Sequence, residues 1–432
     1  MSKTFVAFGF GPISAGLFLY EAYKSGRFDE LVVSEVDPKT VEAVRANGGK
    51  YTFNAATLDG RVTREVEGVT ILNPEEPQDV NGLFDATKRA DEIVTALNNV
   101  EFYSKPTVKD PLQHGLSVNP KRVVVYTAEN NINAAHLLRE SLVELDQMST
   151  ATFVNTVIGK MSQRVTDPSQ IREMNLTPIT PGLESAFLVE EAPDILLARS
   201  QLPPGYETML AIFQEKRDLV PFDGVKLYGH NGPHAMAAYL LALVGAKDMP
   251  QLDDRENVDI RVMAQQAMIA EAGAALCRAY KGQDPIFTQQ GWRTAYAEPL
   301  IKRISNPYLA DSVARVARDP ARKLHPDDRL VGALKFCREH GIRQSYFATG
   351  AAAAALMLDP ETGQLAQEVE VVQPHELAAR LETVWKAQRQ ERFEGKTDVL
   401  DAIGRAYPSL CGWLQGRRPD LFKTDLGFIP YT

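Results

Sequence analysis

Residues 4–35 read TFVAFGFGPISAGLFLYEAYKSGRFDELVVSE, and this stretch decides the fold. A short apolar run rich in β-forming residues, Thr4–Phe10, leads into a glycine turn. Ile13–Lys24 then carries apolar residues at helical spacing, and Leu31–Ser34 is a second run of strand length. The order strand, turn, helix, strand predicts the first βαβ unit of a parallel sheet.

The turn between this strand and helix has the composition of a nucleotide-binding turn. Gly9, Gly11 and Gly16 let the backbone approach a pyrophosphate closely, and N–H groups at the helix start can hold its charge. Ser14 stands where the GxGxxG pattern has its third glycine. We expect these four residues to bind the cofactor; the alternative is an ordinary tight turn.

An acidic residue, Glu35, closes the second predicted strand about twenty residues after the glycines. A carboxylate there accepts hydrogen bonds from both adenosine ribose hydroxyls and repels a 2′-phosphate, so we expect NAD rather than NADP. The alternative is a solvated strand end that leads into a turn at Asp37 and Pro38.

The rest of the first half alternates between strand and helix patterns. Strands are expected at Val69–Leu72, Arg122–Tyr126 and Ala151–Val154, and helices at Ala86–Leu97 and Ile132–Met148. Such alternation predicts an α/β fold with a Rossmann-like, doubly wound parallel sheet.

The pattern of expected secondary structure changes after the turn Leu202–Gly205, which contains two prolines and a glycine. Beyond it lie amphipathic helical patterns, such as Gln265–Tyr280 and Glu376–Gln390, with almost no strand signal. We therefore expect an NAD-binding Rossmann-like domain over residues 1–200 and a mostly α-helical substrate-binding and catalytic domain over residues 201–432.

The composition of the chain limits the binding partners and the cellular compartment that we expect. The net charge of −9 gives no overall attraction to nucleic acid or anionic membranes, so a basic ligand site has to be local. Cys277, Cys337 and Cys411 stand outside any disulfide or zinc spacing, which fits a reducing cytoplasm. No segment approaches the roughly 20 apolar residues of a spanning helix. We expect a cytoplasmic globular protein, monomeric or homodimeric.

Residues 226–234, KLYGHNGPH, bring a lysine, an amide and two imidazoles together before the apolar helix Ala235–Val244. On a helix, Lys226, Asn231 and His234 fall within roughly 140° of arc and can face one cleft. Capping of the helix and bonds to backbone carbonyls are the alternative interpretation of the asparagine and histidines.

This Lys-x4-Asn-x2-His pattern and its helix resemble the active-site segment of the polyol-specific long-chain dehydrogenases, the mannitol dehydrogenase family. Residues 306–330, NPYLADSVARVARDPARKLHPDDRL, resemble the branch of the family that acts on mannitol 1-phosphate. Phe153–Ile158 is similar to the segment that presents an asparagine, here Asn155, to the active site. Ala128–Asn130 is similar to the turn on the cofactor side, which makes Glu129 and Asn130 candidate cofactor contacts.

The resemblance implies a metal-independent, NAD-dependent hydride transfer between a hexitol phosphate, mannitol 1-phosphate, and fructose 6-phosphate. It makes Lys226 the general acid and base, and Asn155 and Asn231 donors to the reacting oxygen. His234 would orient the substrate and the lysine. Asp223 is a possible proton relay, although an aspartate before a glycine also serves turns.

A phosphorylated substrate needs a local basic pocket. The resemblance offers five candidates for it: Arg315, Arg318, Arg322, Lys323 and Arg329. Composition alone favours an ion-paired helix surface, because aspartates are interspersed among them.

Other functions stay open at this stage. The substrate can be a free polyol, as in mannitol 2-dehydrogenases, or a sugar acid of the fructuronate or tagaturonate kind. A non-catalytic nucleotide sensor is the alternative from another class. The joint presence of Lys226, Asn155, Asn231 and His234 argues against a sensor, because pure binding needs no base.

Overall fold

The computed structural model describes residues 2–143, 150–191 and 195–421. The chain divides into two compact units, Met1–Val220 and Pro221–Thr432. The sequence analysis drew its boundary earlier, at residue 200. The first unit continues past that point because β12, Phe213–Lys216, pairs with β11, Ile195–Ala198.

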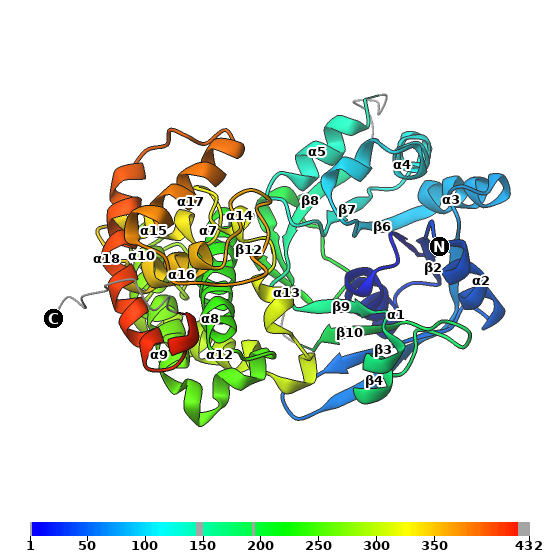
Figure 1. Ribbon diagram of the computed structural model, residues 1–432. Coiled ribbons are helices and arrows are strands. Elements are labelled where there is room, and N and C mark those ends of the chain that lie inside the picture. Colours follow the sequence, from blue (N-terminus) through cyan, green and yellow to red (C-terminus); the bar gives the residue numbers. More distant parts are fainter. Residues whose placement is uncertain (1, 144–149, 192–194, 422–432) are drawn as a thin grey trace. The chain divides into compact units, whose positions relative to one another are not determined.

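The first unit is built on an eight-stranded sheet with the order β12-β11-β8-β7-β6-β1-β2-β5 (Figure 1). Its other strands are β1 (Thr4–Phe8), β2 (Glu30–Ser34), β5 (Val69–Leu72), β6 (Ala90–Thr95), β7 (Val124–Thr127) and β8 (Thr152–Val157). From β1 the chain winds outward through β2 and β5, then returns to β6 on the other side of β1 and continues through β7 to β8, all in parallel. The predicted doubly wound α/β sheet is therefore confirmed, and its winding reverses between β1 and β6.

Different layers cover the two faces of this sheet. Buried apolar side chains of α3 (Pro77–Arg89), α4 (Pro106–Val118) and α5 (Ala134–Ser141) pack on one face. The other face carries the helix made of η1 (Ser14–Leu19) and α1 (Tyr20–Ser25), α2 (Pro38–Ala46) and a second sheet. Short helices complete the unit: η2 (Val100–Ser104), α6 (Pro168–Glu173) and η3 (Arg199–Gln201).

The second sheet has the order β4-β3-β10-β9. Its strands are β3 (Tyr51–Ala56), β4 (Arg61–Val66), β9 (Ser162–Val165) and β10 (Ala186–Glu190). The sequence analysis did not predict it, because these strands are short and several mix polar with apolar residues. Their pairing also joins segments far apart in the chain, which local patterns do not reveal.

The predicted helix Ala86–Leu97 is wrong beyond Arg89, where α3 ends and β6 begins at once. Ala86, Ala90 and Ile93 keep helical spacing across this boundary, so the apolar pattern did not show it. Tertiary pairing decides the strand, because β6 lies between β1 and β7. The predicted helix Ile132–Met148 contains α5, and residues 144–148 lie outside the described residues.

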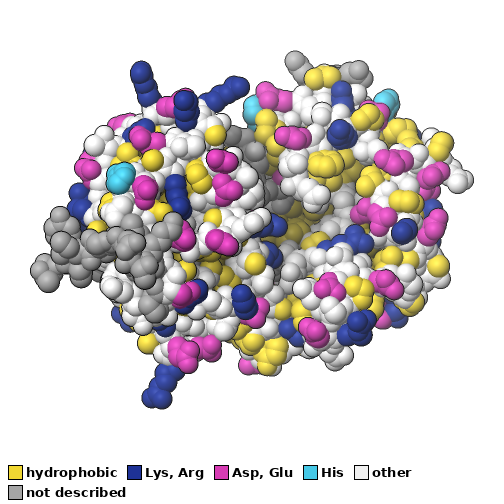
Figure 2. Space-filling model, in the orientation of Figure 1, with side chains coloured by type: hydrophobic (Ala, Val, Ile, Leu, Met, Phe, Trp, Pro, Cys, Tyr) yellow, Lys and Arg dark blue, Asp and Glu magenta, His cyan; other side chains and the backbone are white. Residues whose placement is uncertain are grey.

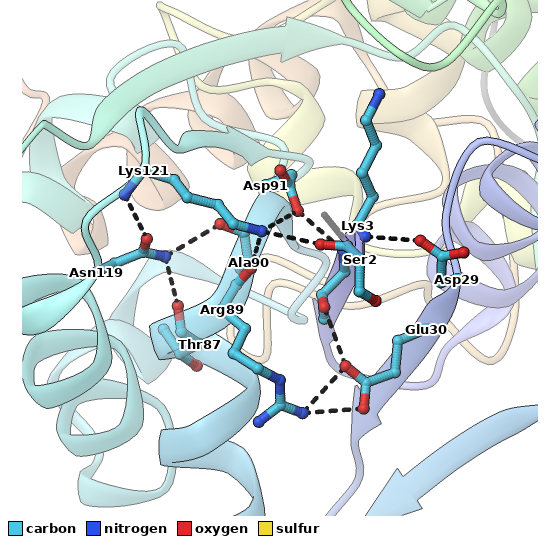
Figure 3. A network of polar contacts seen from close by, with 11 residues as sticks. Ser2, Lys3, Asp29, Glu30, Thr87, Arg89, Ala90, Asp91, Asn119 and Lys121 are labelled. Atoms are coloured by element: carbon cyan, nitrogen blue, oxygen red, sulfur yellow. Dashed lines mark hydrogen bonds and ion pairs between the residues drawn. The ribbon is translucent and has the colours of Figure 1, made fainter.

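A network of paired charges ties the amino-terminal edge of the sheet together (Figure 3). Lys121 donates from Nζ to the carboxylate of Asp91 at 2.7 Å and to the carbonyls of Ser2 and Arg89. Arg89 in turn donates to both oxygens of Glu30. Since these charges satisfy one another, this edge fastens β1 to its neighbours.

The second unit is helical, as predicted. Its longer helices are α8 (Gly232–Leu243), α9 (Val258–Gln266), α15 (Val331–Glu339), α16 (Ser345–Leu356), α17 (Pro374–Ala387) and α18 (Lys396–Gln415). Shorter α-helical elements are α7 (Val220–Gly224), which begins at the boundary, α10 (Ala274–Ala279), α11 (Gln289–Gly291), α12 (Glu298–Ile304), α13 (Val313–Ala317) and α14 (Pro320–Lys323). The π-helices are η4 (Val225–Asn231), η7 (Ala267–Gly273) and η8 (Trp292–Ala297); the 3₁₀ turns are η5 (Met249–Asp253), η6 (Arg255–Asn257), η9 (Pro307–Leu309) and η10 (Pro419–Leu421).

Helices α8 and α16 form the core of this unit. Ala351–Ala355 is completely buried in α16. A Cβ atom at Gly350 would stand only 2.7 Å from Cγ of Met236 in α8, so small residues permit the two helices to pack closely. This close packing holds the amino-terminal end of α8, where the Lys226 turn enters it.

The visible surface mixes charges of both signs. Among the described residues coloured in Figure 2, basic and acidic side chains are interspersed. In the described ranges, no helix combines the length and apolar character that crossing a membrane requires.

Candidate active site

The glycine turn of the first unit lies where the winding of the sheet reverses. Gly9 has φ of +95°, and its N–H donates to the carbonyl of Ser34 at 2.9 Å. A Cβ atom there would lie 2.7 Å from the carbonyl oxygen of Ala96, so only glycine fits. At Gly11 a Cβ atom would meet nothing within 4 Å. Gly9 shapes the turn, and Gly11 leaves open space beside it.

The helix after this turn opens as a π-helix, η1. The hydroxyl oxygen of Ser14 is buried and has no hydrogen-bond partner in the part of the chain that the structure describes. Gly16 serves packing, because a Cβ atom there would stand 2.5 Å from Cγ2 of Val189 in the second sheet. The open space at Gly11 and the hydroxyl of Ser14 fit a bound pyrophosphate at the start of a helix.

Glu35 follows β2 and is held by the backbone on both oxygens. Oε2 accepts from the N–H of Phe10 at 3.1 Å, and Oε1 accepts from that of Asp37 at 2.8 Å. A carboxylate has about four lone-pair sites, so two remain for ribose hydroxyls. The capping role belongs to Asp37, whose side chain accepts from the N–H of Lys39.

Glu129 lies beyond the end of β7 and is buried. Its oxygens accept hydrogen bonds from Thr95, from the N–H of Leu97 and from the hydroxyl of Tyr103. Burial raises the pKa of this carboxyl to about 7. These bonds fix the loops that follow β6 and β7, whereas the neighbouring Asn130 is exposed. A direct contact of either residue with a cofactor stays a prediction.

Asn155 is in β8 of the first unit. Its Oδ1 accepts from the N–H of Ala135 at 2.8 Å, at the start of α5, and its own N–H donates to Gln201. Because the amide oxygen is held in this way, the NH₂ group is the part suited to donate to a ligand oxygen. The orientation of the amide is thus set by the protein.

The Lys226 turn of the second unit is a π-helix, η4, which runs directly into α8. Hydrogen bonds in a π-helix join residues five apart, so Lys226 and Asn231 lie on the same side of it. Gly229 lies against an aromatic side chain, because a Cβ atom there would stand 2.6 Å from Cη2 of Trp292. Trp292 is fully buried and donates from Nε1 to the carbonyl of Met268. The turn therefore rests on a fixed aromatic wall, which the sequence analysis did not identify.

Lys226 has the electrostatics of an acid-base catalyst. Burial lowers the pKa of its ammonium to about 8, the charge of Asp223 acts in the opposite direction, and the charge of Arg329 lowers the pKa further. A lysine at its ordinary pKa of about 10.4 is almost entirely protonated at pH 7. The shift brings Lys226 close to the working range of a general base. A proton relay by Asp223 stays a prediction.

His234 is buried at the start of α8 and faces an acidic partner. Its Nε2 lies 3.4 Å from Oδ2 of Asp311, whose other oxygen accepts from Arg315 at 2.6 and 2.7 Å. Burial raises the pKa of Asp311, but bonding to His234 and Arg315 outweighs burial, and the net pKa is lowered. Asp311 is thus a fixed anion behind His234. It lies in the stretch 306–330, which could have indicated it.

His230 is also buried, with its ring centroid 5.9 Å from that of His234. Burial and then the charge of Arg303 lower its pKa well below the ordinary value, so it is neutral. Arg303, in α12, was not among the predicted site residues, and its charge acts on the Lys226 turn through His230.

The structure separates the five candidate phosphate ligands. Arg315 is paired with Asp311, and Lys323 is buried and donates to the carbonyl of Arg318. The side chains of Arg318 and Arg322 are 66% and 50% exposed. The side chain of Arg329 is only 15% exposed.

Within the described ranges, no group of three or more His, Cys, Asp or Glu side chains is arranged to hold a metal ion.

The comparisons with known proteins agree with this architecture. Residues 218–404 match the family model of the mannitol dehydrogenase C-terminal domain. The curated mannitol-1-phosphate 5-dehydrogenase of Caldanaerobacter subterraneus subsp. tengcongensis is 29% identical over 412 residues, which cover 94% of this chain and 98% of that protein. The enzyme of the same name from Brevibacillus brevis is 29% identical over 371 residues, 84% of this chain and 88% of its own.

Solved structures show the same fold at lower identity. The ternary complex of Pseudomonas fluorescens mannitol 2-dehydrogenase with NAD and D-mannitol has a TM-score of 0.65 at 15% identity and covers 98% of this chain and 94% of that one. A D-sorbitol dehydrogenase in substrate-free form has a TM-score of 0.68 at 15% identity, with 94% and 93% covered. The fold is that of the polyol dehydrogenases. The family model and these relatives confirm the resemblance to the mannitol dehydrogenase family that the sequence predicted, and the curated relatives that match most of the chain are mannitol-1-phosphate 5-dehydrogenases.

Proposed function

We propose that this protein is an NAD-dependent dehydrogenase that interconverts mannitol 1-phosphate and fructose 6-phosphate, with Lys226 rather than a metal ion as general acid and base. The observation that carries the proposal is the half-buried Lys226, with its lowered pKa, on the same π-helix as Asn231. The names of the relatives that span most of the chain supply the substrate.

Oxidation of the polyol needs two bonds to break at one carbinol group. NAD, when bound, supplies the hydride acceptor. Neutral Lys226 takes the hydroxyl proton on Nζ as the carbon–oxygen double bond forms. In the reduction direction the same ammonium returns this proton to the oxygen. A pKa of about 8 suits both directions near neutral pH, because neither protonation state is rare.

The other polar side chains would position the substrate and the developing charge. Asn231 and Asn155 can each donate an N–H to the reacting oxygen, which is typically worth about 2.7–4 kcal/mol for a well-placed donor. His234, with Asp311 behind it at 3.4 Å, would bind a substrate hydroxyl.

Cofactor choice follows from the first unit. Glu35, fixed by two backbone N–H groups, would accept the ribose hydroxyls and repel a 2′-phosphate, so NAD is proposed over NADP. Gly11 and Ser14 would bind the pyrophosphate. The three cysteines are free thiols, which fits the cytoplasm as the proposed compartment.

The test is the appearance of NADH absorbance with purified protein, NAD and mannitol 1-phosphate, compared with mannitol and sorbitol at equal concentration. Turnover of the phosphate, lost in Lys226→Met, supports the proposal. Turnover of free polyols alone would replace mannitol 1-phosphate by a mannitol 2-dehydrogenase-like substrate. If all polyols are inert, NADH oxidation with fructuronate or tagaturonate tests the sugar-acid alternative, and silence there favours a nucleotide sensor.

A further inference from the structure

The segment that contains Arg329 lies directly against the Lys226 turn. A Cβ atom at Gly232, the residue after Asn231, would stand 2.8 Å from the carbonyl oxygen of Arg329. Three residues further on, a Cβ atom at Gly332 would stand 3.2 Å from Cε1 of Tyr228. The close approach at both glycines fixes the backbone of Arg329 beside the proposed site.

The guanidinium of Arg329 is largely buried yet only partly bonded. Its Nε donates to Oδ1 of Asp328 at 2.7 Å, and its side chain is 15% exposed. Its Nη1 and Nη2 have no hydrogen-bond or ion-pair partner in the described ranges of the chain. Four N–H bonds of a planar fork are therefore available to a ligand.

A second polar group of this unit lacks a partner in the described residues. Tyr239 in α8 is completely buried, and its hydroxyl has no hydrogen bond in the part of the chain described. Burial is the main effect and raises the pKa of this phenol. Among the charges that act on it, that of Arg329 has the largest effect and lowers the pKa. A hydroxyl and a fork of N–H donors suit an oxyanion, which accepts from both.

The other four candidate cations are committed elsewhere or point to solvent. Arg315 donates from Nε and Nη2 to Asp311. Lys323 donates to a backbone carbonyl. Nε of Arg318 and Nη2 of Arg322 each lie 3.9 Å from Oδ2 of Asp319. Because both side chains are exposed to solvent, dissolved ions screen their charges.

We propose that Arg329 is the specificity-determining residue of the site: its Nη1 and Nη2 groups bind the phosphate of the polyol substrate and so select phosphorylated over free polyols. The inference rests on the proposed function. A planar fork binds two phosphate oxygens at once, whereas a lysine at this place offers one point charge.

The test compares Arg329→Gln and Arg329→Lys with Arg261→Gln, a partly exposed ion-paired arginine of α9 that serves as control. For mannitol 1-phosphate oxidation we expect KM to rise about 100-fold in Arg329→Gln and about tenfold in Arg329→Lys, since charge-assisted bonds are worth about 1.5–3 kcal/mol. Arg261→Gln should keep the KM of wild type. Thermal unfolding identifies variants that are folded.

The pH profile separates binding from mere structural support. Arg329→Gln removes a positive charge that lowers the pKa of Lys226. The pKa of Lys226 should therefore rise, and the pH at which kcat/KM for oxidation levels off should move upward. Arg329→Lys keeps the charge and should leave this pH unchanged. A KM within threefold of wild type in Arg329→Gln, or an equal loss in Arg318→Gln and Arg322→Gln, overturns the inference.

A binding assay makes the inference independent of turnover. We expect the ³¹P resonance of inorganic phosphate to broaden when wild type or Arg261→Gln is added, because the ion binds. Folded Arg329→Gln should leave the resonance sharp. Equal broadening with all three overturns the inference. If wild type oxidises only free polyols, the proposed substrate and the inference both fail; if it oxidises mannitol 1-phosphate and Arg329→Gln matches it, the inference alone fails.

Discussion

In each unit a glycine-containing turn passes through a π-helix into a buried helix, but the two turns offer different chemistry. In the turn of the first unit, residues 9–16, the backbone is exposed to a ligand: Gly11 leaves open space, and the Ser14 hydroxyl has no partner among the described residues. In the turn of the second unit, residues 226–234, side chains carry the proposed function, and Lys226 is the central one.

The two turns share one structural device. A glycine on the inner side of each lets the helix pack closely: Gly16 against Val189 and Gly229 against Trp292. The difference teaches that a backbone site depends on local conformation, whereas a side-chain site depends on its surroundings. Burial lowers the pKa of Lys226, as the proposed base requires, and no local pattern sets that burial.

The largest effect should come from the second turn. Lys226→Met keeps the volume of the side chain and removes the amine, so kcat should fall about 10²–10⁴-fold, the range of general acid-base catalysis. NADH binding, measured by fluorescence titration, should stay near wild type. Lys323→Met, at a buried lysine bonded to the carbonyl of Arg318, is the control and should keep kcat within a few-fold. Near-normal turnover in Lys226→Met would contradict the assignment.

The first turn should respond in cofactor affinity instead. Glu35→Ala removes the two proposed ribose contacts and should weaken NAD binding about 10–100-fold, since hydrogen bonds to charged groups are worth about 1.5–3 kcal/mol. Preference for NAD over NADP, measured as a ratio of kcat/KM values, should fall with it. Glu30→Ala, at the opposite end of β2, is the matched control. An unchanged ratio in Glu35→Ala would assign Glu35 to the turn alone.

Adding a methyl group at the closely packed glycine of either turn should destabilise the fold to a similar extent. Gly16→Ala and Gly229→Ala place a Cβ atom 2.5 and 2.6 Å from a neighbouring side chain, so each should lower the free energy of unfolding by about 1–3 kcal/mol. Gly404→Ala in α18, where a Cβ atom meets nothing, should raise it by about 0.5–1 kcal/mol. Urea unfolding measures all three. Wild-type stability in Gly229→Ala would show that the side chain of Trp292 moves to accommodate the added methyl group.

The smallest effect is the pH dependence of the second turn. In the proposed mechanism the base is neutral Lys226, whose pKa is lowered to about 8, so kcat/KM for oxidation should rise about tenfold per pH unit below 8 and level off above it. For reduction, which needs the ammonium, kcat/KM should fall as pH rises through the same value. A limb near pH 10 would mean that Lys226 is not desolvated in solution.

Much of the first unit could be predicted because its signals are local. The strand before Gly9, the helix after it and the acidic end of β2 lie within one βαβ unit, where hydrophobic spacing and turn chemistry suffice. The strand β6 could not be predicted, since Ala86, Ala90 and Ile93 continue a helical period. Only pairing with β1 and β7 makes it extended.

By itself the sequence determined the α/β class, the glycine turn and the constellation of Lys226, Asn231 and His234, because each rests on residue types at short, fixed spacing. Tertiary structure alone decided which charges are available. Five basic residues between 315 and 329 look alike in the sequence, yet only folding pairs Arg315 with Asp311, buries Lys323 on a carbonyl and leaves the Arg329 fork unpaired in the described chain. The partners of Arg315 and Lys323 lie only four and five residues away, so the sequence permits these contacts, but only the folded chain decides which of them form and how far each side chain is buried. Pairing and burial together set the charge and pKa that chemistry uses.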